Sequence, residues 1–350
     1  FPRIREAAEA EDYRAFDYSG VRTEDGRQGW GSTSVEPRKH HVYTGLTNTI
    51  GILLETPRNS RRVLQNGTVV EIPEEDRYYH QIRGGVIALS TILEVAAEKR
   101  EEIRNLTTAS RMRAINAGHE GAGEVVLDYE VSNRGDEPVW MPDWNAELGY
   151  SLQTVPVWLR WIPTRTTKRP VGYLMPPAMA AVVPILIDHD IAVYRFTGSS
   201  SIDAEVYYAT DVQTESYFQG HYLKAVEVER ESETVEVQEG WFWIPTAQSM
   251  GNLITYLMEP ETDDNLITWG WTDHILEETP ESEEALLEAM LGGRTMSELA
   301  TDQQQRIRER ATSILSRRQQ VPMMRVLSHQ RISVMRVQPF NQYQRNRFFR

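Results

Sequence analysis

The stretch PRKHHVYTGLTNTIGILLETP, residues Pro37–Pro57, carries the strongest fold signal of this chain. Its second half, Thr47–Leu54, is largely apolar and Pro57 follows it, which predicts a short buried strand. Glu55 lies at the end of that strand. Ligands of open α/β sheets bind beyond the carboxyl ends of the strands, so Glu55 is a candidate catalytic residue. The alternative is an ordinary solvated acid at a strand end.

The next part of the chain predicts a long helix from Pro73 to about Leu106. Apolar residues recur there every three or four positions and form one face. They are Ile82, Val86, Leu89, Ile92, Leu93 and Ala96. We expect this face to pack over the sheet that contains the Glu55 strand.

After Asn105 the pattern changes to alternation and turns, which predicts a β-rich region. The predicted strands are residues 124–132, 155–161, 171–175, 191–196, 205–209, 223–230, 234–238 and 240–244, with a turn at 133–135. Helices are predicted at 176–189 and 248–258. Residues 281–318, interrupted by Gly292 and Gly293, predict an antiparallel helical hairpin. The alternation of apolar and basic residues over 323–337 predicts an edge strand.

Composition bounds the possible chemistry. Hydrophobic residues make up 40% and charged residues 25% of the 350 residues, as in ordinary soluble proteins, and the length favours two or three domains. There is no cysteine, so disulfides, thiolate metal sites and cysteine nucleophiles are excluded. The most apolar run, Ala178–Ile187, is too short to cross a bilayer, and we expect no membrane partner. The chain begins without Met or a signal peptide, so we expect a processed or truncated product.

Charge is unevenly distributed along the chain. The net charge of −14 argues against a nucleic-acid partner, because phosphate binding needs clustered Lys and Arg. Residues Gln303–Arg350 nevertheless contain eleven Arg and one acid. We expect this basic tail to pair with the acidic run Glu277–Glu288 within the molecule.

Several segments resemble the bacterial carboxypeptidase A-like zinc metallocarboxypeptidases. Residues Pro37–Pro57 match the pattern of that family, which is Pro-Arg, then Tyr-x-Gly-Leu-x-Asn, then an apolar strand that ends in Glu. Thr49 replaces the Arg that usually follows the Asn. Further similar segments follow in the same order. They are GYLMPP at 172–177, HDIAVYRF at 189–196, FQGH at 218–221 and WIPTAQSMGNLITYLMEPETDDNLITWGWTD at 243–273.

The resemblance implies a mechanism and a role for one residue. In the family, zinc polarises the scissile carbonyl and acidifies a bound water, and a glutamate takes the proton from that water. Glu55 matches this catalytic glutamate. Arg38 is a candidate for lining the substrate cleft.

The zinc ligands of the family have no counterpart before Glu55. In the family, the His-x-x-Glu pair and the third zinc ligand precede the strand that ends in the catalytic glutamate. The first histidine of this chain is His40, so no such pair precedes it. His40 and His41 are adjacent and would point to opposite faces of a strand. A His-x-x-Glu occurs at His274–Glu277, but we interpret it as coincidental. We therefore predict zinc in the parent protein and no metal ligands in this chain.

The predicted fold class is an α/β remnant of a zinc carboxypeptidase fold followed by a β-rich α+β region. The predicted domains are 1–106, the C-terminal part of the catalytic domain; 107–276, the β-rich domain with an inserted αβ unit; and 277–350, the helical hairpin and basic tail.

The predicted function is that of a fragment of a metallocarboxypeptidase-like peptidase, inactive alone. Its predicted partners are a peptide or protein substrate and the missing N-terminal catalytic half. The alternative is a non-catalytic binding or structural module on a degenerate scaffold. The family resemblance also implies a periplasmic or extracellular location.

Overall fold

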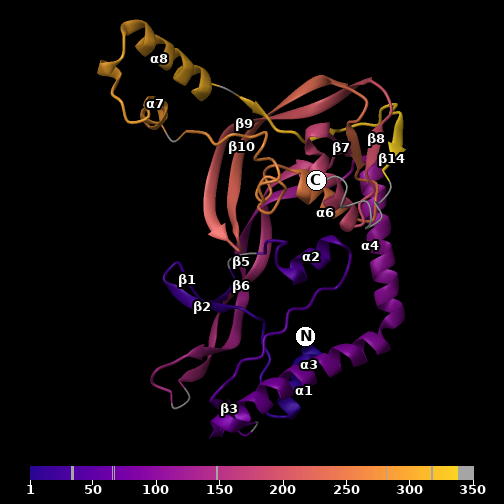
Figure 1. The fold of residues 1–350 in the computed structure, drawn as a ribbon. Helices are drawn as coiled ribbons and strands as arrows, with labels where there is room; N and C mark the ends of the chain where they lie inside the picture. The colour runs from indigo at the N-terminus through magenta and orange to yellow at the C-terminus, as the bar shows by residue number, and fades with distance from the viewer. Residues whose placement is uncertain are drawn as a thin grey trace. The chain divides into compact units, whose positions relative to one another are not determined.

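The computed structural model describes residues 1–32, 35–64, 66, 68–146, 149–280, 282–316 and 318–337. The chain is a mixed α/β protein in which helices and sheets alternate (Figure 1). It divides into two compact units: unit 1 comprises residues 1–110 and 129–164, and unit 2 comprises residues 111–128 and 165–350. The division at 1–106, 107–276 and 277–350 stays a prediction.

The region predicted as one long helix is helical, but it consists of two helices that are separated at Lys99, and the second continues to Glu120. The helices of unit 1 are α1 (Pro2–Ala10), α2 (His40–Leu46), α3 (Arg77–Glu98) and the start of α4 (Arg100–Glu120). Helix α1 packs on α3. This packing is reinforced by ion pairs between Arg83 and Glu11 at 2.6 Å and between Arg3 and Glu98 at 3.3 Å.

Unit 1 also contains most of a four-stranded sheet in the order β1-β2-β6-β5. The strands are β1 (Gly20–Glu24), β2 (Arg27–Gly31), β5 (Glu124–Pro142) and β6 (Tyr150–Lys168). Its core consists of Val139, Met141, Val155 and Val157. The turn predicted at 133–135 was wrong, because β5 continues through these residues. A separate ribbon pairs β3 (Arg61–Val63) with β4 (Val69–Glu71).

Unit 2 is built on an eight-stranded sheet, which confirms the β-rich prediction for this part of the chain. The strands on its main path are β10 (His221–Val237), β9 (Ser200–Phe218), β13 (Met324–Val326), β7 (Gly172–Met175), β11 (Phe242–Pro245), β8 (Tyr194–Phe196) and β14 (Val334–Arg336), in that order. The short strand β12 (Gln319–Gln320) pairs with β9. The predicted strands 223–230 and 234–238 are one continuous strand, β10.

The turn between β9 and β10 shows why these residues form a hairpin. Gln219 and Gly220 both have positive φ angles, 46° and 93°. Two-residue hairpins favour such turns because their twist matches that of the strands. The result is the long two-stranded ribbon of Figure 1.

Helices of unit 2 fall close to the predicted positions. They are the 3₁₀ helix η2 (Pro177–Val182), α5 (Val183–Asp188) and α6 (Gly251–Met258). The predicted helical hairpin is confirmed by α7 (Glu283–Leu291), packed against α8 (Thr301–Leu315). Ser282 caps the start of α7, and Gly292 ends it with a left-handed conformation at φ 57°.

The C-terminal segment corrects one prediction. Residues 323–337 do not form a single edge strand: β13 is inserted between β9 and β7, and β14 lies at the edge of the sheet. Arg318 pairs with Glu229 at 3.1 Å and with Glu231 at 2.7 Å on β10, and the pairing of the whole basic tail with the run Glu277–Glu288 stays a prediction. Residues 338–350 of the predicted basic tail lie outside the described residues.

Candidate functional site

The segment that carries Glu55 is held in place by the end of α2. Asn48 has a positive φ of 57° and its backbone N–H donates to Gly45, so the helix stops there. The buried Asn48 side chain accepts a 2.8 Å hydrogen bond from the Ser110 hydroxyl. The chain then turns back onto α2, where a Cβ on Gly51 would lie 1.9 Å from Thr44 Oγ1. Only glycine allows this close approach.

Glu55 lies on an exposed segment without regular secondary structure, residues 49–59. The predicted strand is therefore wrong, because no strand among the described residues pairs with the segment. Its apolar residues are accessible, and Ile50 is 58% exposed. The segment is nevertheless anchored to α3, since Gln81 Nε2 donates a 2.6 Å hydrogen bond to the carbonyl of Thr56.

Arg38 precedes α2 in a turn and is partly buried. Its neighbour Lys39 pairs with Glu36 at 3.0 Å. Arg38 thus lies just before the short helix α2, and Glu55 lies on the segment that follows this helix. The substrate-binding role of Arg38 stays a prediction.

The side chains of this chain do not fit a zinc site in the described ranges. No three His, Asp or Glu side chains there are close enough together to hold a metal ion. His40 and His41 begin the helix α2 and do not lie on a strand. His274 Nε2 lies 3.0 Å from the carbonyl oxygen of Ala178.

A buried charged cluster in unit 2 was missed by sequence reasoning. Glu259 is fully buried and accepts hydrogen bonds from the hydroxyls of Tyr173, at 2.5 Å, and Tyr207. Arg325 is 1% exposed, and its Nε lies 3.2 Å from Glu259 Oε1. Burial raises the pKa of Glu259, while the charge of Arg325 and the tyrosine hydrogen bonds act in the opposite direction.

The same arginine connects several strands. Arg325 Nη1 donates a 2.8 Å hydrogen bond to Thr167 Oγ1 and lies 3.2 Å from Glu205 Oε2. Thr167 Oγ1 also accepts a 2.9 Å hydrogen bond from Arg230. The sequence signal was a charged residue inside the apolar run MMRVL, which is typical of a buried ion pair rather than of an edge strand.

Residues 243–273, the longest of the segments that resemble the family, contribute to the interior of unit 2. Asn265 is buried, and its amide donates to the carbonyls of Pro260 and Thr262 at 2.9 and 2.6 Å. Its Oδ1 accepts from the backbone of Ile267 and Thr268 at 2.7 and 3.0 Å. Asn265 therefore organises the loop after α6 through four hydrogen bonds.

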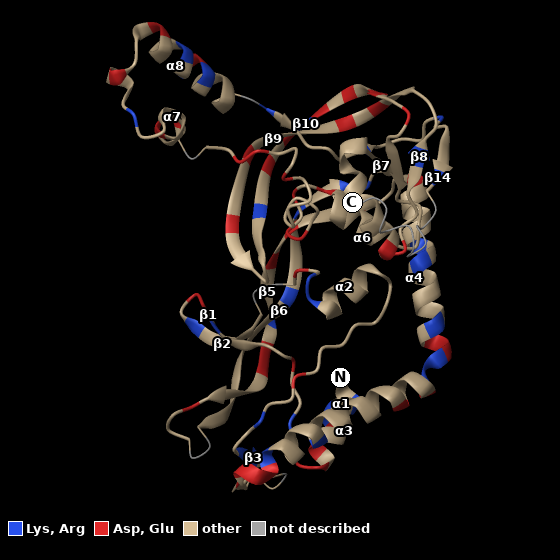
Figure 2. Cartoon of the chain, viewed as in Figure 1, with Lys and Arg blue, Asp and Glu red and all other residues tan. Residues whose placement is uncertain are grey.

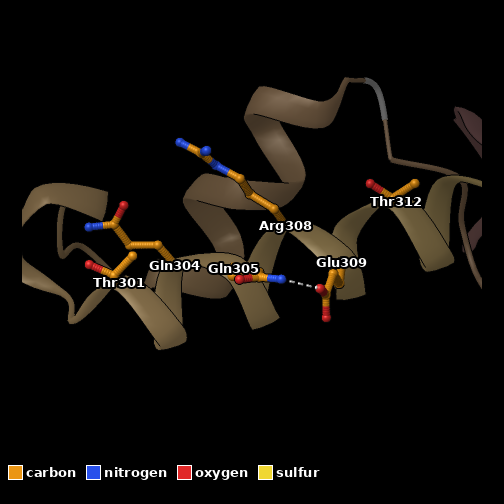
Figure 3. Close-up of a pocket in the computed structure, with 6 residues that line it drawn as sticks. All are labelled: Thr301, Gln304, Gln305, Arg308, Glu309 and Thr312. Carbon is orange, nitrogen blue, oxygen red and sulfur yellow. Dashed lines mark hydrogen bonds between the residues drawn. The ribbon is translucent and has the colours of Figure 1, made fainter.

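A surface pocket lies along α8, lined by the polar residues shown in Figure 3. They are Thr301, Gln304, Gln305, Arg308, Glu309 and Thr312. All come from one helix, and Gln305 donates a 2.9 Å hydrogen bond to Glu309. Pockets that bind small molecules are concave and bury most of the ligand, which the side chains of a single helix cannot do, so this one does not resemble a substrate site.

No family model, no curated protein and no solved structure matches this chain. In the part of the chain that the structure describes, no helix is both long and apolar enough to cross a membrane. The family resemblance, the role that it implies for Glu55 and the candidate role of Arg38 therefore stay predictions.

Proposed function

We propose that this chain is part of a zinc-dependent metallocarboxypeptidase-like peptidase and that Glu55 is its general base. The observation that carries the proposal is the match of Pro37–Pro57 to the glutamate strand of that family. Exposure of Glu55 supports it, because a general base must reach a water beside its substrate. In this proposal unit 1 contains a remnant of the carboxypeptidase α/β domain.

The zinc ligands are, in this proposal, supplied by another part of the parent protein. Glu55 takes a proton from the attacking water and delivers it to the leaving amine, and Arg38 lines the cleft that receives the peptide or protein substrate. Neither role requires a metal ligand from residues 1–350. The family resemblance further supports a periplasmic or extracellular location.

Peptide hydrolysis and bound zinc, measured side by side, test the proposal. We expect the parent protein to bind zinc and to hydrolyse peptides, and residues 1–350 alone to do neither. Zinc-dependent hydrolysis by residues 1–350 alone would contradict it, since a complete site would then exist in this chain.

The second candidate function is a non-catalytic binding or structural module. It is favoured by the absence of a His-x-x-Glu before Glu55 in this sequence. The gene sequence separates the two candidates. A His-x-x-Glu and a later His encoded before Phe1 favour the peptidase, and a start codon immediately before Phe1 favours the module.

A further inference from the structure

Two histidines that are far apart in sequence meet at the surface of unit 2. His119 lies in the last turn of α4, and His329 lies in the loop between β13 and β14. The centroids of their imidazole rings are 4.9 Å apart, and the ring planes are inclined by 50°. Both residues are exposed, so the pair is accessible to a ligand.

A hydrogen bond determines which nitrogen of His329 carries the proton. Its Nε2 contacts the backbone carbonyl oxygen of His119, and because a carbonyl oxygen can only accept, this nitrogen is the donor. In the neutral ring the lone pair is therefore on Nδ1. Histidines that bind metal ions usually donate their second N–H to a carbonyl or carboxylate in this way. His329 thus already has the hydrogen bond that is typical of a metal ligand.

The backbone around the pair is held in place on both sides. Gln330 makes two hydrogen bonds with the backbone of Asp203, at 2.7 and 2.9 Å. At the end of α4, Gly121 has a φ of 59°, and a Cβ there would lie 3.5 Å from the carbonyl oxygen of Leu327. The end of α4 and the loop that contains His329 are therefore close together before any ligand binds, which lowers the entropy cost of binding.

The end of α4 favours a cation. The carbonyl groups at the C-terminus of a helix carry a partial negative charge. Residues 114–119 contain no Lys, Arg, Asp or Glu, and Glu120 follows them, so the last turns of this helix carry no fixed positive charge (Figure 2). A divalent ion bound at His119 would therefore be attracted by this end of the helix.

The distance between the rings fits one shared metal ion. Imidazole nitrogens bind such ions at about 2.0–2.1 Å, which places the centres of two neighbouring rings roughly 5 Å apart. Among the described residues no third His, Asp or Glu side chain completes the pair, whereas zinc in proteins has three or four protein ligands. Cu²⁺ accepts tetragonal sites of nitrogen and oxygen atoms and binds a given nitrogen site more tightly than the other divalent first-row ions.

We infer that His119 and His329 form a Cu²⁺ site to which each ring contributes one nitrogen, and that the bound ion ties the end of α4 to the loop after β13. The site lies in unit 2, whereas Glu55 lies in unit 1, and it is separate from the zinc chemistry of the proposed function. Because the two rings come together only in the folded chain, the ion stabilises the fold of the C-terminal segment.

Titration of residues 1–350 with Cu²⁺, followed by visible absorption and electron paramagnetic resonance of the ion, tests the site. We expect His119→Ala and His329→Ala each to lower the Cu²⁺ affinity by at least about 10–100-fold. The first variant keeps the backbone carbonyl that His329 contacts, so it removes a ligand without removing the hydrogen bond. His274→Ala is the matched control, because His274 Nε2 lies 3.0 Å from the carbonyl oxygen of Ala178. This control should leave the affinity unchanged.

Thermal unfolding gives a second measurement. At a free Cu²⁺ concentration about 100 times the Kd, we expect Tm of the natural chain to rise by about 5–10 °C and Tm of His329→Ala to change by less than about 2 °C. Mg²⁺ should raise neither, because it prefers oxygen ligands. Equal Cu²⁺ affinity in the natural chain and His119→Ala would overturn the inference. An equal loss of affinity in His274→Ala would also overturn it, because copper would then bind to single surface histidines.

Discussion

Arg325 Nε lies 3.2 Å from Glu259 Oε1, and both side chains are buried in unit 2. Arg325 comes from the short strand β13 near the C-terminus, whereas Glu259 follows helix α6. The pair therefore joins β13, a strand in the middle of the sheet, to the loop after α6, which lies much earlier in the sequence. This makes the C-terminal segment part of the fold of unit 2.

Replacing Arg325 with Met is expected to destabilise unit 2 by about 3–5 kcal/mol, because it leaves Glu259 buried without its counter-charge. Thermal or denaturant unfolding measures this loss. The double variant Arg325→Met with Glu259→Gln is the matched control. It is expected to recover most of the stability, because the buried charge is gone; no recovery would show that the ionic contact is not the cause.

The destabilisation by Arg325→Met is also expected to depend on pH. An acid whose pKa is higher in the folded than in the unfolded chain binds more protons when folded, so its contribution to stability falls as pH rises above the unfolded value of 4.5. Burial already raises the pKa of Glu259, and loss of Arg325 raises it further. The loss of stability should therefore be smaller at about pH 5 than at about pH 7.5. A difference that does not change with pH, measured against Arg325→Met with Glu259→Gln, would exclude titration of Glu259.

Gly51→Ala is expected to displace the segment that carries Glu55. The new Cβ would lie 1.9 Å from Thr44 Oγ1 and 2.6 Å from the carbonyl oxygen of His41. We expect a loss of about 1–3 kcal/mol and faster tryptic cleavage after the exposed Arg58.

Gly45→Ala is the control for this variant on the same helix. A Cβ on Gly45 meets nothing within 4 Å, so alanine should be neutral or slightly stabilising. If both variants behave alike, the close contact between Gly51 and α2 is not what holds the segment.

The sequence predicted helices and strands better than it predicted which of them pair and which side chains are buried. The helical period around Leu89 and the alternation in β9 and β10 are local signals, and both elements are present. The strand at Thr47–Leu54 was wrong because a strand requires a partner, which its own residues cannot supply. Exposure of Leu89 was unexpected for the same reason.

The candidate site was predictable only in part. Glu55 was identified by the motif in Pro37–Pro57. Gly51 lies within the same segment, so its role in positioning Glu55 could have been suspected from the sequence. The pairing of Arg325 with Glu259 could not be predicted, because it joins residues that are far apart in sequence. They meet in the folded chain because β13, which carries Arg325, lies between β9 and β7, and Glu259 at the end of α6 is buried against it.

The role of Glu55 is decided by peptide hydrolysis with the complete zinc-loaded protein, compared between the natural chain and Glu55→Gln. We expect kcat to fall about 10²–10⁴-fold in the variant with unchanged zinc content, because it loses the base that takes the proton from water. Unchanged kcat in Glu55→Gln would contradict this role.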